Sequence, residues 1–133
     1  MVNTVHVGIG PLGQKVLRYA VERGCFNVVG AVDPDPEKAG KDLGQLCGIE
    51  PLGIIIRDNL ADAIMGQSVD PALSRGQPLP ATSRGKAGVA LVTTVSSIVA
   101  LESQVAELAN ARLNIVSTCE ELFFPWKTNP EVA

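Results

Sequence analysis

The sequence predicts an α/β fold built on a doubly wound parallel sheet, and three observations lead to this prediction. Short apolar, β-branched segments alternate along the chain with segments of helical periodicity. The first of them, Val2–Ile9, carries Val5, Val7 and Ile9 on one side and small or weakly polar residues on the other, which is typical of a strand covered on both faces. A glycine-rich turn then leads directly into a helix. Right-handed βαβ crossovers would give the strand order 3-2-1-4-5, and this chain need not hold every strand of such a sheet.

Three helices are predicted in the first half of the chain, and the first two have clear start signals. The first begins at Pro11 and ends near Gly24, since proline suits the first helical turn and glycine the residue after the last. The second is expected from Asp35 to about Gly44, because Asp35 suits its cap and Pro36 its first turn. The apolar stripe of the first helix consists of Leu12, Val16 and Tyr19 or Ala20. The other elements expected in this half are strands at Phe26–Val32 and Gly53–Arg57 and a helix from Asp58 or Asn59 to Met65.

The second half of the chain begins with an irregular stretch. Residues 66–88 are rich in Gly, Pro and Ser without a sustained period, so they are predicted to be mostly loop. A strand at Val89–Val95 follows, then a helix that Ser96 or Ser97 caps, and then a strand at Leu113–Ser117. Two further expectations are a buried helix face of Leu101, Val105 and Leu108 or Ala109, and another helix start at Asn129-Pro130-Glu131.

Composition indicates one globular domain, residues 1–133, and argues against several kinds of partner. Apolar residues make up 46% of the chain and charged residues 19%, which suits a packed core. The net charge of −3 without a basic stripe argues against nucleic acid, and no apolar run approaches the ~20 residues of a membrane span. No signal-peptide pattern precedes the first strand. Three scattered cysteines without a CxxC pattern predict a cytoplasmic protein with neither a disulfide framework nor a metal site.

The glycines Gly8, Gly10 and Gly13 have the spacing of a dinucleotide-binding loop. The pattern GxGxxG is weak evidence alone, but here it joins a predicted strand to a predicted helix. We expect Gly8 to allow the tight turn, Gly10 to let a pyrophosphate approach the backbone, and Gly13 to let the helix pack close to the sheet. The helix dipole and the N–H groups of Leu12 and Gly13 would hold the phosphates, because Pro11 has no N–H. An ordinary βα turn is the alternative.

An acidic residue, Asp33, ends the second strand about 20 positions after the loop, where dinucleotide-binding domains bind the ribose hydroxyls. Its carboxylate would repel a 2′-phosphate, and Pro34-Asp35 supply no arginine to receive one. The sequence therefore favours NAD over NADP as the cofactor. Lys38, the nearest cation, leaves NADP open. A plain turn residue is the alternative for Asp33.

The cofactor crevice is expected between the first and fourth strands, at their carboxyl ends. The fourth strand ends in Thr93-Thr94-Val95-Ser96-Ser97, whose small hydroxylated side chains suit a ribose and a pyrophosphate. We therefore predict cofactor contact for Thr93, Thr94 and Ser96, with helix capping as the alternative for Ser96.

The fifth strand ends beside the same crevice in Ser117-Thr118-Cys119-Glu120-Glu121. Cys119 is a candidate nucleophile of the acylating aldehyde dehydrogenase type, but a reactive thiol needs a base nearby. His6 lies in the first strand, on the wrong side of the sheet for this role, so Cys119 as a packing residue is the alternative. Glu120 and Glu121 either bind a cationic substrate amine or are solvated.

Three longer stretches carry a family resemblance. They are GIGPLGQKV at residues 8–16, GAVDPDPEKAGKDLGQLCGIEPLG at residues 30–53 and, most specifically, NIVSTCEELFFPW at residues 114–126. On these stretches the chain resembles the N-terminal domain of dihydrodipicolinate reductase-like proteins, in particular the branch that includes 2,4-diaminopentanoate dehydrogenase. The resemblance implies a Rossmann-type domain for NAD or NADP. It assigns cofactor binding to Gly8, Gly10, Pro11, Leu12, Gly13, Asp33 and the loop Thr93–Ser96.

The resemblance also implies an oxidoreductase that transfers a hydride between nicotinamide and a carbon bonded to nitrogen, in an amino-acid-like substrate or a cyclic imine. In such proteins a C-terminal α+β domain binds the substrate, holds the catalytic residues and forms the homo-oligomer. That domain is expected to be absent from this chain, so no catalytic residue is assigned and the chain alone is expected to be inactive. A module that binds NAD(H) without turnover and an acylating dehydrogenase using Cys119 stay open as alternatives.

Overall fold

The computed structural model describes residues 1–24, 26–64 and 86–133. Its five-stranded sheet has the order β3-β2-β1-β4-β5, and each pair of neighbouring strands is parallel. The predicted α/β fold class and strand order are therefore confirmed. The strands are β1 (Val2–Val7), β2 (Phe26–Val32), β3 (Ile56–Arg57), β4 (Val89–Val92) and β5 (Asn114–Ser117).

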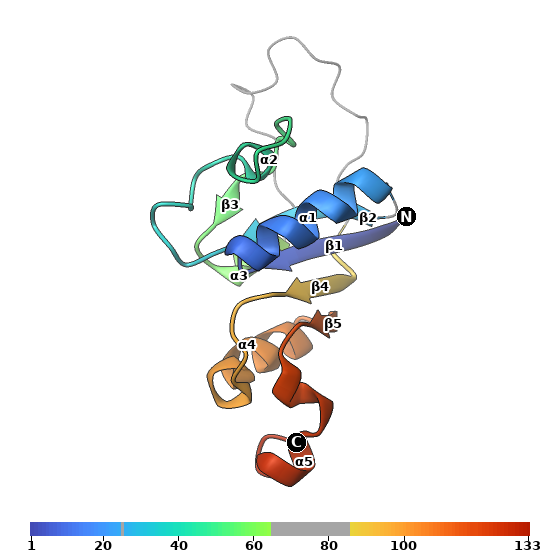
Figure 1. Cartoon of the computed structure of the whole chain (residues 1–133), viewed down its shortest axis with the longest axis vertical. Helices are drawn as coiled ribbons and strands as arrows, with labels where there is room; N and C mark the ends of the chain where they lie inside the picture. Colours follow the sequence, from blue (N-terminus) through green and yellow to red (C-terminus); the bar gives the residue numbers. More distant parts are fainter. Residues whose placement is uncertain (25, 65–85) are drawn as a thin grey trace.

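Helices cover both faces of this sheet, and each face has its own cluster of buried side chains. On one face α1 lies across β1 and β2 (Figure 1). Its Leu17 belongs to the same buried cluster as Val28 and Ala31 of β2. On the other face α3 and α4 pack against Val5 and Val7. The helices are α1 (Pro11–Arg23), α2 (Leu43–Leu46), α3 (Leu60–Ile64), α4 (Ile98–Asn110) and α5 (Pro125–Thr128), with a 3-10 helix η1 at Glu120–Phe123. No described helix is long and apolar enough to cross a membrane.

Helix α1 begins at the expected residue, and its predicted buried stripe is correct in part. Its buried residues are Gly13, Leu17 and Ala20. Of the predicted stripe, Ala20 is buried and Val16 is half-buried, whereas Leu12 and the alternative Tyr19 are 49% and 63% exposed. The reason is the close approach of Gly13 to the carbonyl of Gly8, which turns the side of the helix that carries Gly13 toward the sheet. Leu12 therefore lies at the mouth of the loop, outside the core.

The helix predicted from Asp35 to Gly44 does not form. Asp35 caps a single turn, in which its side chain accepts a hydrogen bond from the N–H of Glu37 at 2.9 Å. Gly40 ends that turn with a φ of +83°, and its N–H donates to the carbonyl of Ile56 in β3 at 2.9 Å. This contact with β3 redirects the chain before a second helical turn can follow.

Helix α2 starts at the next aspartate instead. The buried Asp42 is its N-cap, and its carboxylate accepts hydrogen bonds from the N–H groups of Gly44 and Gln45. The same carboxylate accepts the N–H groups of Leu52 and Ile54 on the approach to β3. Because two of these donors lie ten or more residues away in sequence, local capping rules favoured Asp35 over Asp42.

The elements observed in the second half of the chain agree more closely with those predicted from the sequence. In the irregular stretch predicted at residues 66–88, residues 66–85 lie outside the described part of the chain. Strand β4 ends at Val92, so Thr93 already belongs to the loop before α4. Asn129 starts a single turn, in which its carbonyl accepts the N–H of Val132 at 3.1 Å. The buried residues of α4 are Ile98, Leu101 and Leu108, with Val105 partly buried.

Candidate functional site

Gly8 turns the chain out of β1 at the carboxyl end of the sheet. Its φ of +88° lies in the left-handed region, where glycine is strongly favoured. A Cβ atom at Gly8 would lie 2.6 Å from Cγ2 of Thr94. The N–H of Gly8 donates to the carbonyl of Val32 at 2.9 Å, and its carbonyl accepts the hydroxyl of Thr93 at 2.7 Å. Gly8 thus makes the expected tight turn and joins the loop to β2 and β4.

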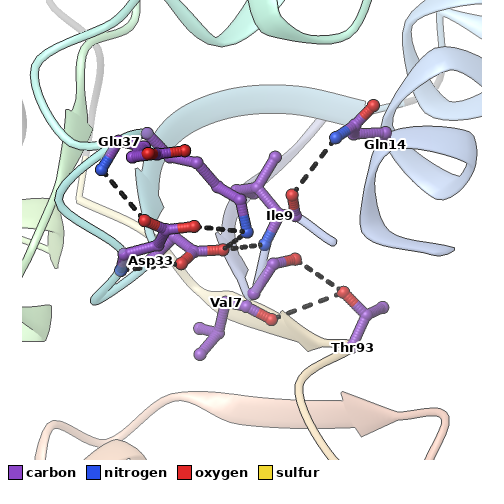
Figure 2. Close-up of polar contacts among 9 residues, drawn as sticks. Val7, Ile9, Gln14, Asp33, Glu37 and Thr93 are labelled. Carbon is purple, nitrogen blue, oxygen red and sulfur yellow. Dashed lines mark hydrogen bonds and ion pairs between the residues drawn. The ribbon is translucent and has the colours of Figure 1, made fainter. Parts of the chain in front are cut away.

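Ile9 is fixed from two other sides, as Figure 2 shows. Its N–H donates to Oδ2 of Asp33 at 2.8 Å, and its carbonyl accepts Nε2 of Gln14 at 3.3 Å. All four backbone polar groups of Gly8 and Ile9 are therefore satisfied within the protein. The loop is held in one conformation by β2, β4 and α1 together.

Gly10 and Gly13 differ in what surrounds them. A Cβ atom at Gly13 would collide with the carbonyl oxygen of Gly8 and lie 2.7 Å from Oγ1 of Thr93, so only glycine lets α1 approach the sheet this closely. A Cβ atom at Gly10 would meet nothing within 4 Å. The backbone of Gly10 has a φ of −77° and a ψ of −174°, which any residue adopts. The protein itself therefore places no demand for glycine at position 10.

The N-terminus of α1 carries backbone donors without partners. Within the described ranges, the N–H groups of Gly10, Leu12 and Gly13 donate to no protein atom, and the first bond of the helix is from Gln14 N–H to the carbonyl of Gly10. The cap makes no side-chain hydrogen bond, and the first turn holds no acidic residue. Donors of this kind, together with the positive end of the helix dipole, favour an anion.

Asp33 lies directly beside this loop, with its side chain only 8% exposed. Oδ2 accepts the Ile9 N–H and Nζ of Lys38 at 3.0 Å, and Oδ1 accepts the N–H of Asp35 at 3.0 Å. Burial works to raise the pKa of Asp33, but the Asp35 and Ile9 hydrogen bonds and the Lys38 ammonium outweigh it and lower the pKa. Asp33 is thus an ionised carboxylate that points toward the glycine loop (Figure 2).

The residues predicted after β4 have three different environments. Thr93 bonds the glycine loop, as described above. The hydroxyl of Thr94 donates to Oε1 of Gln104 in α4 at 2.8 Å, while its methyl group lies against Gly8. Ser96 is exposed, and its carbonyl accepts the thiol of Cys119 at 3.2 Å. The structure therefore brings Thr93 and Thr94 to the glycine loop, and it places Ser96 near the end of β5.

Cys119 is a buried residue that packs with the α3 and α4 side of the core. Its thiol donates to a backbone carbonyl, and no titratable side chain bonds it in the described ranges. His6, in the middle of β1, shares the opposite face of the sheet with Thr4. The two residues are therefore not partners, and no base bonds the Cys119 thiol in residues 1–24, 26–64 and 86–133.

Glu121 occupies a role that the sequence assigned to serine. Its Oε2 accepts the N–H of Ile98, the first residue of α4, at 2.7 Å. Ser97 is the N-cap residue by position, but its side chain makes no capping bond. The carboxylate of Glu121 therefore caps α4 across the loop after β5, while Glu120 is exposed.

Sequence reasoning missed Gln14 and Arg57. Gln14 is a surface residue by type, and only the structure shows its amide on the Ile9 carbonyl. Arg57 ends β3 beside Val32, and its carbonyl accepts the N–H of Asp33 at 2.9 Å. Its buried Nε has no hydrogen-bond partner among the residues that the structure describes. In the part of the chain that the structure describes, no three His, Cys, Asp or Glu side chains gather as metal ligands.

The parallel sheet and the glycine loop define a Rossmann-type α/β domain. The 4-hydroxy-tetrahydrodipicolinate reductase of Anaeromyxobacter sp. (strain Fw109-5) is 40% identical to the chain over 70 residues, which are 52% of this chain and 26% of that protein. This similarity confirms the resemblance to dihydrodipicolinate reductase-like proteins. No protein-family model matches the chain.

Two solved structures have the same fold. The amine dehydrogenase from Mycobacterium smegmatis aligns with a TM-score of 0.78 and 25% identity, over 98% of this chain and 33% of that chain. The protein RSP, solved in complex with β-NADH, aligns with a TM-score of 0.53 and 16% identity, which shows the fold alone. The chain thus spans about a quarter of the reductase and a third of the amine dehydrogenase.

Proposed function

We propose that residues 1–133 form the NAD(P)-binding domain of a dihydrodipicolinate reductase-like oxidoreductase. The observation that carries the proposal is the loop from Gly8 to Gly13, in which the protein fixes two residues and leaves the N–H groups of Gly10, Leu12 and Gly13 without partners. The open space at Gly10 fits the close approach of a diphosphate. Hydrogen bonds to a charged group contribute about 1.5–3 kcal/mol each, so three such donors favour an anion at the N-terminus of α1.

The proposal assigns the adenosine ribose to Asp33. The carboxylate is ionised, lies beside the loop and has hydrogen-bond capacity left after its three protein donors. Ribose hydroxyls donate to such a group, whereas a 2′-phosphate is repelled by it. We therefore infer a preference for NAD over NADP. Thr93, Thr94 and Ser96 complete the proposed lining of the cofactor crevice.

The finer parts of the proposal come from the resemblance and from the printed names of the relatives. Both named relatives are oxidoreductases, a reductase and an amine dehydrogenase. When bound, nicotinamide supplies a hydride acceptor or donor, and the proposed reaction exchanges that hydride with a carbon bonded to nitrogen in an amino acid or cyclic imine. On the same basis we propose that the chain belongs to the 2,4-diaminopentanoate dehydrogenase branch and works with a C-terminal substrate domain. We also propose a homo-oligomer and a cytoplasmic location.

Calorimetric titration of the chain with NADH and NADPH tests the ribose assignment. Asp33→Ala is expected to weaken NADH binding by about tenfold or more, because charge-assisted hydrogen bonds to the ribose are lost, and to weaken NADPH binding less. Glu107→Ala, which removes an exposed carboxylate from α4, is the charge-matched control and should change neither affinity. Equal losses for NADH and NADPH in Asp33→Ala would mean that Asp33 only supports the loop, and the assignment would be withdrawn.

A further inference from the structure

We propose that the outer edge of β5 pairs with β5 of a second copy of this chain, in a two-fold antiparallel contact that joins the two sheets. This inference goes beyond the proposed function, which takes a homo-oligomer from the family resemblance and gives it no surface within residues 1–133. The evidence is the open backbone edge of β5, its uncharged sequence and the charges at its two ends.

Strand β5 is the edge of the sheet beyond β4 (Figure 1), and no strand of the described ranges lies on its outer side. The N–H groups of Asn114 and Thr118 donate to carbonyls on the β4 side at 3.0 and 3.1 Å. Because successive residues of a strand alternate in direction, Val116 also turns its backbone groups toward β4. The N–H and C=O groups of Ile115 and Ser117 therefore point to the open edge.

The opposite edge of the sheet is closed by the chain itself. There β3 has only two residues, and the N–H and carbonyl of Ile56 bond the carbonyl of Lys41 and the N–H of Gly40. The residues after β5 do not play this part for their own edge. Leu122 and Pro125 line a groove together with side chains of α4. The segment after β5 thus lies along α4 and leaves the edge of β5 open.

The sequence of β5 suits pairing with another strand. Exposed edge strands are usually protected by lysine, another charge or proline, and Asn114–Ser117 contains none of these. Ile115 packs against the buried cluster on the α4 side, so its neighbour Val116 faces the other side of the sheet. Val116 is 58% exposed there. An uncharged edge with an exposed apolar side chain favours association through that edge.

Two-fold symmetry restricts the register of such a pair. Ile115 and Ser117 carry the outward groups, and a two-fold axis at Val116 places Ile115 of each copy opposite Ser117 of the other. Each such pair exchanges both of its N–H···O=C bonds. Val116 then faces the partner's Val116 as a non-hydrogen-bonded pair, in which the Cα atoms lie about 4.5 Å apart and the side chains touch.

The same register brings opposite charges together at both ends of the contact. Arg112, just before β5, comes to lie opposite the partner's Glu120, just after β5, and the symmetry repeats this pair. Both side chains are exposed, and in the described ranges neither forms an ion pair within its own chain. A parallel pairing would instead place like charges beside each other. Charge complementarity therefore favours the antiparallel pair with a second copy.

The test measures the average molar mass of the chain by sedimentation equilibrium in reducing buffer. The wild-type mass should rise from that of one 13.9 kDa chain toward that of two as the concentration rises from about 1 μM to 1 mM. The variants are Val116→Lys, Arg112→Glu, Glu120→Arg and the last two combined. Val21→Lys on α1 and Lys41→Glu beside β3 are the matched controls away from β5. Unfolding, measured where the wild-type chain is monomeric, and NADH binding report separately on the fold and the cofactor site.

Val116→Lys should weaken the dimer at least about tenfold, because it places like charges face to face at the two-fold axis. Arg112→Glu and Glu120→Arg should each weaken it about threefold or more, and the combined variant should restore wild-type association, because the two charges are then only exchanged. Neither control should change the dissociation constant of the dimer.

Three results would overturn this inference. They are a wild-type chain that stays monomeric up to about 1 mM, which leaves the edge for a segment of different sequence; a dimer that Val116→Lys leaves intact; and a combined variant that associates no better than Arg112→Glu alone. NADH binding of the same samples would still decide the proposed function by itself.

Discussion

At the scale of single residues, the polar pair Thr4 and His6 stands apart from the rest of the core. Both lie on the α1 side of β1, with 0% and 1% of their surface exposed. In the part of the chain that the structure describes, Oγ1 of Thr4 and both ring nitrogens of His6 lack hydrogen-bond partners. Burial lowers the pKa of His6 from 6.5 to about 4. His6 is therefore neutral in the folded chain at neutral pH.

This shift predicts a pH-dependent stability. In the unfolded chain His6 takes up a proton as the pH falls below 6.5, and in the folded chain it does so only near pH 4. The free energy of unfolding should therefore be fully retained above pH 6.5 and fall by about 3 kcal/mol as the pH falls to 4. Denaturant unfolding between pH 4.5 and 7 measures this slope. His6 is the only histidine of the chain, so no other histidine titrates in that window.

Two variants separate titration from burial. His6→Leu removes the titrating group and should flatten the dependence of stability on pH between 4.5 and 6.5. Thr4→Val removes the other unpartnered polar group on the same face and should raise stability by about 1 kcal/mol at every pH. A slope that persists in His6→Leu would show that another group causes it.

At the scale of elements, the N-termini of the helices are satisfied in different ways. Asp42 caps α2 from within its own segment, and Glu121 caps α4 from 23 residues away. Helix α1 has neither kind of carboxylate, because Gly10 is its cap. Carboxylates thus bond the first N–H groups of α2 and α4, whereas no side chain caps α1 in the described ranges.

The cap of α4 makes a testable prediction for stability. Glu121→Ala removes the acceptor of the Ile98 N–H and a negative charge at the positive end of α4, so the free energy of unfolding should fall by about 1–2 kcal/mol. Glu120→Ala is the matched control, since Glu120 is also exposed but makes no capping bond in the described ranges. Guanidinium unfolding at neutral pH measures both variants. The same loss in both, or none in Glu121→Ala, would contradict a capping role.

The elements also show what local sequence patterns are able to predict. Period and composition predicted every strand of the sheet to within a few residues, because buried parallel strands need continuous apolar segments. The prediction that the second helix starts at Asp35 was wrong. The actual cap, Asp42, is fixed by N–H donors near β3 that lie far along the chain. The predicted stripe of α1 was right at Ala20 and wrong at Leu12 and Tyr19. Gly13 packs close to the sheet as expected, but a pattern of apolar side chains gives no weight to a glycine contact.

At the scale of the whole molecule, the candidate site depends on the convergence of β2, β4 and α1 on one loop. Spacing alone predicted the three glycines and Asp33 as neighbours, since the carboxyl ends of adjacent parallel strands share one edge of the sheet. Spacing did not predict that Thr93 and Gln14 use up the polar groups of Gly8 and Ile9. The N–H groups of Gly8 and Ile9 bond the Val32 carbonyl and Asp33, so in the described ranges the loop amides without partners begin at Gly10.

The most direct measurement of the central claim is NADH binding to Gly10→Ala. The new methyl group meets no protein atom within 4 Å, so the variant should keep its unfolding temperature, while the methyl group blocks the diphosphate and weakens NADH binding by about tenfold or more. Gly88 directly precedes β4, at the amino end of the parallel strands, and a Cβ atom there would meet only the Asn3 carbonyl at 3.9 Å. Gly88→Ala should therefore change neither the unfolding temperature nor NADH binding. The account predicts saturable NADH binding that Gly10→Ala alone weakens; wild-type affinity in Gly10→Ala would contradict it.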